Sequence, residues 1–302
     1  MKRILLATIL ILGTTSIFAQ DKTEKDTIPD GWKKTGKITF LVNQSAFSNW
    51  QAGGDNSFAG NINANYDFNY KKGDLTIDNK LLASYGLTNT KDDGTRKTDD
   101  RLEFNSILGK KWKRNWSYSF FMNLKTQFTD GYDYSADFTG DNEDFPVSGI
   151  FKPAYWSFGP GLLWKKNDNL HVNFAPLAAK FTFIFGEVFK YNSGLGIFES
   201  SDDIEVFGVD PGDSSLFELG FNIRAYYKFD LMKNISMENI LSLYSNYLNK
   251  PGNIDIDYTA NLVMKINDVF STNLTFQTIY DDNAYSGFQV REVFGVGLNY
   301  NF

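Results

Sequence analysis

The C-terminal end of the chain alternates between two kinds of side chain. Large apolar residues occupy every second position, and glycine or asparagine fills each position between them. The apolar set is Phe294, Val296, Leu298, Tyr300 and Phe302. A period of two is typical of a β-strand, whose side chains point alternately to its two faces. Such a strand separates an apolar environment from a polar one, as it does where a sheet divides lipid from a wet lumen.

This pattern resembles the closing strand of bacterial outer-membrane β-barrels, which ends on an aromatic residue and is recognised by the barrel-assembly machinery. The resemblance implies that the five apolar residues are an assembly signal. It also implies that outer-membrane lipid and the assembly machinery are partners of the chain. The sequence thus predicts where the protein resides before it predicts what the protein binds or transports.

The N-terminal residues are typical of a secretory signal peptide. Met1-Lys2-Arg3 is basic, residues 4–12 form a short apolar run, and Ala19 precedes a cleavage position. The run is too short to span a membrane as a helix. We therefore expect residues 1–19 to be a signal peptide, and the polar residues 20–35 to form a periplasmic tail. The barrel domain is predicted to occupy residues 36–302.

Composition narrows the class of protein. Aromatic residues make up 17% of the 302 residues, and prolines number only 7. The formal net charge of −6 disfavours a nucleic-acid partner, which would require a basic surface. The chain has no cysteine, which excludes disulfides and thiolate metal sites. A large soluble β-sandwich is compatible with these totals, so the pattern of the individual strands must decide.

Alternating segments recur along the chain as in an antiparallel sheet. Residues 58–70 alternate aromatic and apolar residues with a row of asparagines, which suits a hydrogen-bonding lumen better than a packed core. The strands number about twelve, an even number as in bacterial single-chain barrels. The pattern is weakest in residues 149–186, where prolines interrupt it. A change of parity between Ala178 and Phe181 predicts a bulge there.

Loop lengths and aromatic residues favour a membrane-spanning barrel. Short turns alternate with connections that are mostly longer, as expected for periplasmic turns and extracellular loops. Aromatic residues of the apolar parity cluster at both strand ends: Tyr70, Trp112, Trp116, Trp164, Phe229, Phe270 and Phe302 near the short turns, and Tyr85, Phe128, Tyr247 and Tyr280 opposite them. Two aromatic girdles predict a transmembrane antiparallel up-and-down β-barrel with both termini in the periplasm.

Charged residues of both signs have the parity that faces the lumen. They are Asp67, Asp78, Lys80, Arg101, Glu103, Lys125, Glu218, Arg224, Lys228, Glu238, Asp255, Asp257 and Lys265. One interpretation is a charged constriction that selects small solutes. The other is a set of cross-strand ion pairs that fills a narrow lumen.

The sequence favours a non-enzymatic protein without a cofactor or metal. The single histidine, His171, has inward parity and no nearby serine partner, so we expect a hydrogen-bonded lumen residue rather than a catalytic base. The acidic segments 130–148 and 187–214 are predicted to be solvated loops. Their oxygen atoms leave calcium binding open, although their spacing matches no known ligand loop.

Six short motifs carry a more specific resemblance. They are Trp50-x-x-Gly53-Gly54, Lys97-Thr98-Asp99-Asp100, Thr126-Gln127-Phe128-x-x-Gly131-Tyr132, Pro153-Ala154-Tyr155, Ala175-Pro176-Leu177 and Ile279-Tyr280-Asp281-Asp282. Together with the closing strand, they resemble an uncharacterised family of outer-membrane barrels, domain of unknown function 3078. The resemblance implies the location and the fold, and it brings no activity.

The motif residues fall near the outer ends of the predicted strands. The candidate mouth and lumen residues are Trp50, Asp99, Arg101, Lys125, Gln127, Tyr155, Arg224 and Asp281. Two functions remain open at this point. One is a narrow channel or transporter for small solutes. The other is a non-conducting barrel with a binding or structural role at the cell surface, which it performs through its extracellular loops and mouth.

Overall fold

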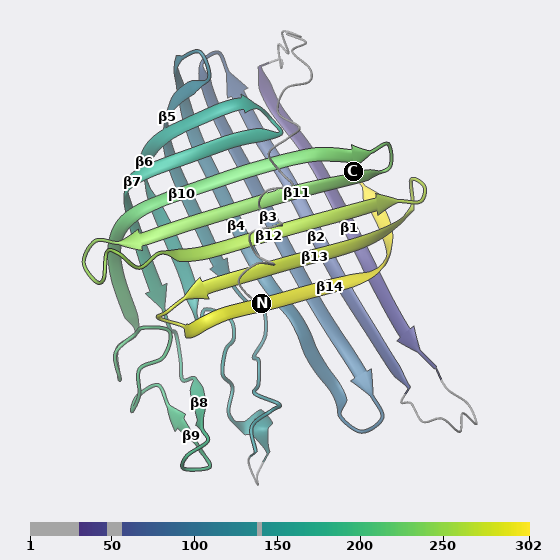
Figure 1. Cartoon of the computed structure of the whole chain (residues 1–302), viewed down its shortest axis with the longest axis vertical. Helices are drawn as coiled ribbons and strands as arrows, with labels where there is room; N and C mark the ends of the chain where they lie inside the picture. The colour runs from purple at the N-terminus through teal and green to yellow at the C-terminus, as the bar shows by residue number, and fades with distance from the viewer. Residues whose placement is uncertain (1–29, 47–55, 138–140) are drawn as a thin grey trace, which may run out of the picture.

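The computed structural model describes residues 30–46, 56–137 and 141–302. These residues form a closed antiparallel barrel of twelve strands, as expected from the sequence (Figure 1). The barrel strands are β1 (Gly31–Ser45), β2 (Ser57–Lys72), β3 (Leu75–Thr90), β4 (Gly94–Lys113), β5 (Trp116–Thr126), β6 (Ala154–Asn167), β7 (Leu170–Phe183), β10 (Ser215–Met232), β11 (Ile235–Asn246), β12 (Asp255–Lys265), β13 (Phe270–Asp281) and β14 (Tyr285–Asn301). No helix in the described ranges is long and apolar enough to cross a membrane.

Barrel strands that are consecutive in the chain pair with each other, and β14 pairs with β1 to close the wall. The register between β1 and β14 joins residues 37–42 to residues 296–301, which is the shortest register between neighbouring barrel strands in the described ranges. Beyond it, the N–H of Gly36 donates to the carbonyl of Phe302 at 2.6 Å, and the N–H of Phe302 donates back at 2.9 Å. Closure leaves no open sheet edge facing lipid along this join, which we call the seam.

The outer face of the barrel is apolar and the inner face is polar. Along β14 the five apolar residues of the closing strand are 45 to 65% exposed, whereas Gly295 and Gly297 are buried on the lumen side. Exposed aromatic residues gather near both barrel ends and include Trp112, Trp116, Phe270 and Phe302 at one end and Phe128 and Tyr247 at the other. An apolar exterior between two aromatic girdles defines a transmembrane β-barrel.

The two ends of the barrel differ in their connections. At the turn end, short turns join β2 to β3, β4 to β5, β6 to β7, β10 to β11 and β12 to β13, and both Gly31 and Phe302 lie there. At the loop end, the connections include the long segments between β5 and β6 and between β7 and β10. The first holds a short 3-10 helix, η1 (Asn142–Asp144), and the second holds a two-stranded sheet of β8 (Phe189–Asn192) and β9 (Ile197–Ser200), which projects from the barrel in Figure 1.

The barrel begins earlier in the chain than the sequence predicts. Strand β1 begins at Gly31 rather than at residue 36, and residues 31–35 pair with residues 67–71 of β2. Trp32 lies on the outer face against Tyr70, with ring centroids 5.1 Å apart. The lysines that follow Trp32 hide the alternation, because their polarity resembles that of a tail.

The bulge lies a few residues before its predicted place between Ala178 and Phe181. The registers of β7 with both neighbouring strands shift around Pro176, between Ala175 and Ala178. Proline has no N–H to donate, so the ladder is interrupted where it occurs. The extra residue reverses the parity of β7 beyond the bulge, and Lys180 consequently points into the lumen.

The segment 187–214 is folded rather than a solvated loop. Besides the hairpin of β8 and β9, it contributes Val188, Val206 and Val209 to a cluster of buried side chains with Ile184. The sequence prediction failed here because the acidic residues of this segment are interspersed with apolar ones that pack on each other. The loop end of the barrel therefore carries a folded segment, residues 187–214, which we call the cap.

Candidate functional site

The described residues of the lumen enclose several cavities, of which three are large and lie between groups of charged side chains. The loop-side cavity measures about 370 Å³ and is lined by residues of β4 to β7 and β10 to β13 among others. The turn-side cavity measures about 400 Å³ and lies among β1 to β4, β6, β7, β10 and β11. The β1-side cavity measures about 290 Å³ and lies beside β1 and β13. In the described part of the chain, the polar inner faces of the strands are therefore not fully packed.

Glu103 is the centre of the tightest group of lumen side chains. It is fully buried, and its carboxylate accepts hydrogen bonds from Arg101, from Asn105 Nδ2 at 2.9 Å and from Asn123 Nδ2 at 3.0 Å. Arg224 Nη2 reaches the same carboxylate at 3.3 Å from β10. We call these five residues the Glu103 cluster, and it links β4 and β5 to β10 through the lumen. Charge-assisted hydrogen bonds of this kind are roughly twice as strong as neutral ones.

A second bridge joins β5 to β12. Lys125 Nζ lies 2.5 Å from Asp257 Oδ2, and Gln277 Nε2 donates to the other carboxylate oxygen at 2.9 Å. Lys125 and Arg224 thus cross the lumen as the sequence interpretation of paired charges requires. Cavities nevertheless remain between the bridges, so ion pairs do not fill the described part of the lumen completely.

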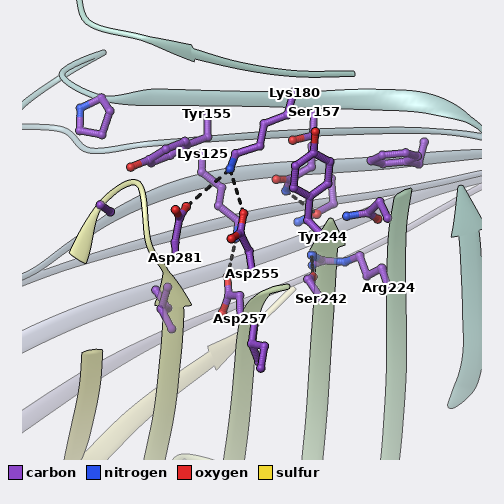
Figure 2. Close-up of a pocket in the computed structure, with 18 of the residues that line it drawn as sticks. Lys125, Tyr155, Ser157, Lys180, Arg224, Ser242, Tyr244, Asp255, Asp257 and Asp281 are labelled. Carbon is purple, nitrogen blue, oxygen red and sulfur yellow. Dashed lines mark hydrogen bonds and ion pairs between the residues drawn. The ribbon is translucent and has the colours of Figure 1, made fainter. Parts of the chain in front are cut away.

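Lys180 forms the third group, which lies toward the loop end (Figure 2). Its Nζ lies 3.1 Å from Glu218 Oε2, 3.3 Å from Asp255 Oδ2 and 3.5 Å from Asp281 Oδ2, and 5.0 Å from the centroid of the Tyr244 ring. Sequence parity missed Lys180, because the bulge in β7 turns it inward. It also missed Tyr244, which no motif singles out.

The predicted mouth and lumen residues are only partly brought together. Lys125, Gln127, Tyr155, Arg224 and Asp281 line the loop-side cavity. Asp99 lies apart from it, where its carboxylate accepts hydrogen bonds from Arg291 and from Asn61 Nδ2. Arg101 lines the β1-side cavity and pairs with Glu103. Trp50 lies outside the described residues.

The single histidine lies in the lumen, in accordance with its parity. His171 stacks on Tyr226 with ring centroids 4.9 Å apart and lines the turn-side cavity. Tyr226 donates to Glu238 Oε2 at 2.8 Å. His171 Nδ1 is buried without a hydrogen-bond partner within the described chain, so the hydrogen bonding expected of this histidine is not found at that atom.

Three carboxylates approach each other closely enough to share a cation. Oxygen atoms of Asp255, Asp281 and Asp282 lie within 4.8 Å of one another. Lysines already neutralise part of this charge: Lys180 contacts the first two, and Lys250 lies 3.5 Å from Asp282. The group belongs to strand ends, not to the acidic segments in which calcium binding was left open.

The fold and the division of its two faces place the protein in the class of outer-membrane β-barrels. Within that class, the sequence model of the family described as "Protein of unknown function (DUF3078)" matches residues 42–132. The resemblance inferred from the motifs is thereby confirmed over this segment, which runs from β1 to just beyond β5. No curated protein matches the chain.

Several solved structures are similar in fold. An outer membrane channel from Pseudomonas putida F1 is 10% identical with a TM-score of 0.39, covering 94% of this chain and 99% of that one. The translocator domain of the autotransporter NalP from Neisseria meningitidis is 12% identical with a TM-score of 0.36, covering 92% and 90%. Outer membrane phospholipase A from Escherichia coli is 11% identical with a TM-score of 0.34, covering 92% and 94%. These scores are too low to support any inference about activity.

Proposed function

We propose that the protein is a narrow channel or transporter for small solutes in the outer membrane. The observation that carries the proposal is the sequence of cavities along the lumen. The loop-side and turn-side cavities share Asn105, Ile107 and Arg224 in their walls, so they meet at the Glu103 cluster. The Glu103 cluster is therefore the group of side chains that separates these two cavities.

The size and lining of the lumen support a selective path rather than a wide pore. Barrels of about eight strands fill with side chains and those of sixteen or more leave a channel, so twelve strands lie between the two. Gln127 Oε1 and Tyr244 Oη are buried at the loop-side cavity without a hydrogen-bond partner within the described chain. Such groups suit polar solutes, while charged side chains at the narrowest point select among them.

The turn end is proposed to face the periplasm, with both chain termini on that side. Short periplasmic turns and longer extracellular loops are the usual asymmetry of outer-membrane barrels. On this orientation, the loop-side cavity and the Lys180 group face the cell exterior. The apolar residues of β14 then serve as the assembly signal for the barrel-assembly machinery.

Location is tested by fractionation and by gel mobility. We expect the protein in the outer-membrane fraction, and we expect the purified barrel to migrate faster on a detergent gel before boiling than after it, because the closed sheet resists detergent at room temperature. A folded monomer released with the soluble periplasmic proteins would contradict the assignment to the membrane.

Conductance is tested in planar bilayers with folded protein. We expect stable single-channel steps, and we expect Arg224→Ser to raise the conductance about twofold or more, because it removes one of the two arginines of the cluster that separates the loop-side and turn-side cavities. Lys250→Ser is the matched control, since Lys250 is an exposed lysine at the loop end. Insertion of verified folded protein without any conductance would contradict the proposal.

The alternative is a non-conducting barrel that acts through its mouth. The specific observation in its favour is the packed cap of segment 187–214, where Val188, Val206 and Val209 are buried and Phe207 reaches the loop-side cavity. An ordered extracellular segment suits a binding surface better than a solvated loop does. Absence of conductance in the experiment above would favour this alternative.

A further inference from the structure

We propose that Lys37 and Lys228 form an anion-binding site in the lumen, and that the solutes of the barrel are small oxyanions carrying phosphate or carboxylate groups. The proposal rests on the proposed function where it names a solute class. The site itself makes a separate claim about binding, which holds or fails whether or not the barrel conducts.

The charge of the lumen changes along its length. The loop-side cavity is lined by three basic residues and three carboxylates: Lys125, Lys180 and Arg224 with Asp255, Asp257 and Asp281. The turn-side cavity has six basic residues against three: Lys33, Lys71, Lys80, Lys165, Arg224 and Lys228 with Asp67, Asp78 and Asp168. The β1-side cavity has five against two: Lys37, Lys80, Arg101, Lys228 and Arg291 with Asp67 and Glu238. Beyond the Glu103 cluster, the lumen is therefore positive.

Most of these basic side chains have a carboxylate partner. Lys80 lies 3.9 Å from Asp67 and 3.7 Å from Glu238. Lys165 lies 2.9 Å from Asp78 and also contacts the adjacent turn. Arg101 and Arg291 are paired as described above. Within the described ranges, by contrast, no ion-pair partner is found for Lys33, Lys37 or Lys228, and of these three only Lys37 and Lys228 border the β1-side cavity.

The residues paired directly with Lys37 carry no charge. Lys37 lies on β1 and is flanked across the strands by Asn301 on β14 and Asn65 on β2. Both are amides. The register of β1 with β14 and β2 therefore gives Lys37 no cross-strand carboxylate.

Lys228 does have a carboxylate opposite it, but that carboxylate is engaged elsewhere. Its cross-strand neighbour is Glu238. Glu238 accepts from the Tyr226 hydroxyl at 2.8 Å and from Asn261 Nδ2 at 3.3 Å, and it lies near Lys80. Both oxygens of Glu238 thus contact other side chains, and within the described chain Lys228 forms no ion pair with either of them.

The two lysines line the same cavity from well-separated strands. Lys37 on β1 and Lys228 on β10 both border the β1-side cavity, and four strands separate β1 from β10 around the shorter arc of the wall. Like charges that face a partly enclosed cavity focus a positive potential within it. An oxyanion between them would provide both the missing charge and several strong acceptors. Rings of lysine or arginine serve the same purpose in anion and phosphate pores.

Selectivity is tested by the reversal potential in a potassium chloride gradient across a planar bilayer. We expect the wild-type barrel to prefer chloride. We expect Lys37→Gln/Lys228→Gln to shift the preference toward potassium by about twofold or more in permeability ratio. The matched control is Lys72→Gln/Lys166→Gln, which removes the same charge from exposed lysines at the turn end that border none of the three cavities. A conducting wild-type barrel that prefers potassium would overturn the inference and leave the channel proposal standing.

Binding is tested separately by titration calorimetry of the folded barrel in detergent with inorganic phosphate. We expect saturable binding that weakens about tenfold or more in the double variant at Lys37 and Lys228 and is unchanged in the control. Heat-dependent gel mobility verifies that each variant is folded. Absence of phosphate binding to the wild type, or equal weakening in the control, would overturn the site. A barrel that binds phosphate in this way without conducting would retain the site and lose the channel.

Discussion

Removal of Asn301 and Phe302 is expected to lower the amount of folded barrel in the outer membrane about tenfold, because in lipid each unpaired backbone group costs several kcal/mol. The seam is short, and these residues contribute the pair of hydrogen bonds at Gly36 and the pairing of Asn301 with Lys37. The Phe302 ring also packs directly over the Cα of Gly36 and stacks near Tyr66, with centroids 6.0 Å apart. Quantitative immunoblotting of membrane fractions measures the effect.

A substitution at Gly36 tests the packing of the Phe302 ring while leaving the residues of the assembly signal unchanged. A Cβ at Gly36 would overlap the Phe302 ring, whereas a Cβ at Gly60 would meet its nearest neighbours at 3.8 Å. Gly36→Val is therefore expected to reduce folded barrel and Gly60→Val to have little effect. Wild-type levels of the truncated protein would show that the seam does not depend on these residues.

Substitution of Glu103 by alanine is expected to lower the free energy of unfolding of the barrel by about 3 kcal/mol, the usual cost of removing one partner from a buried ion pair. Glu103 is fully buried, and its loss leaves Arg101 and Arg224 without their shared counter-charge. The amides of Asn105 and Asn123 lose an acceptor as well. Urea unfolding of the refolded protein in lipid vesicles, followed by tryptophan fluorescence, measures the difference.

Asp268 provides the control for this measurement. It lies 4.0 Å from Lys265 in an exposed pair at a turn, and exposed pairs contribute little. Asp268→Ala is expected to leave the unfolding curve unchanged. Equal shifts for the two variants would mean that the Glu103 cluster does not hold the strands together across the lumen.

The barrel could be predicted from the sequence because a lipid-facing strand imposes a strict period of two. The alternation of β14 and the aromatic residues at the strand ends follow directly from that requirement. The same parity places Arg101, Lys125 and Arg224 in the lumen. Because each lipid-facing position must be apolar, the requirement can be recognised in the sequence at single residues.

The partners of the lumen residues could not be predicted in the same way. Whether Arg291 meets Asp99 depends on which strands face each other across the lumen, and the two residues are 192 positions apart in the chain. The inward position of Lys180 could not be predicted for a different reason. One extra residue at the bulge near Pro176 reverses the faces of the β7 residues that follow it. Closure and register depend on all the strands of the barrel together, so the alternation within one strand does not predict them.

The shortness of the seam has a consequence for how the wall fails. Every hairpin of the barrel has a longer register than the join of β1 with β14. We therefore expect the wall to open at the seam before any hairpin separates under heat or denaturant. Such opening would give a curved sheet with two free edges, and free edges are the surfaces through which sheets of different molecules pair.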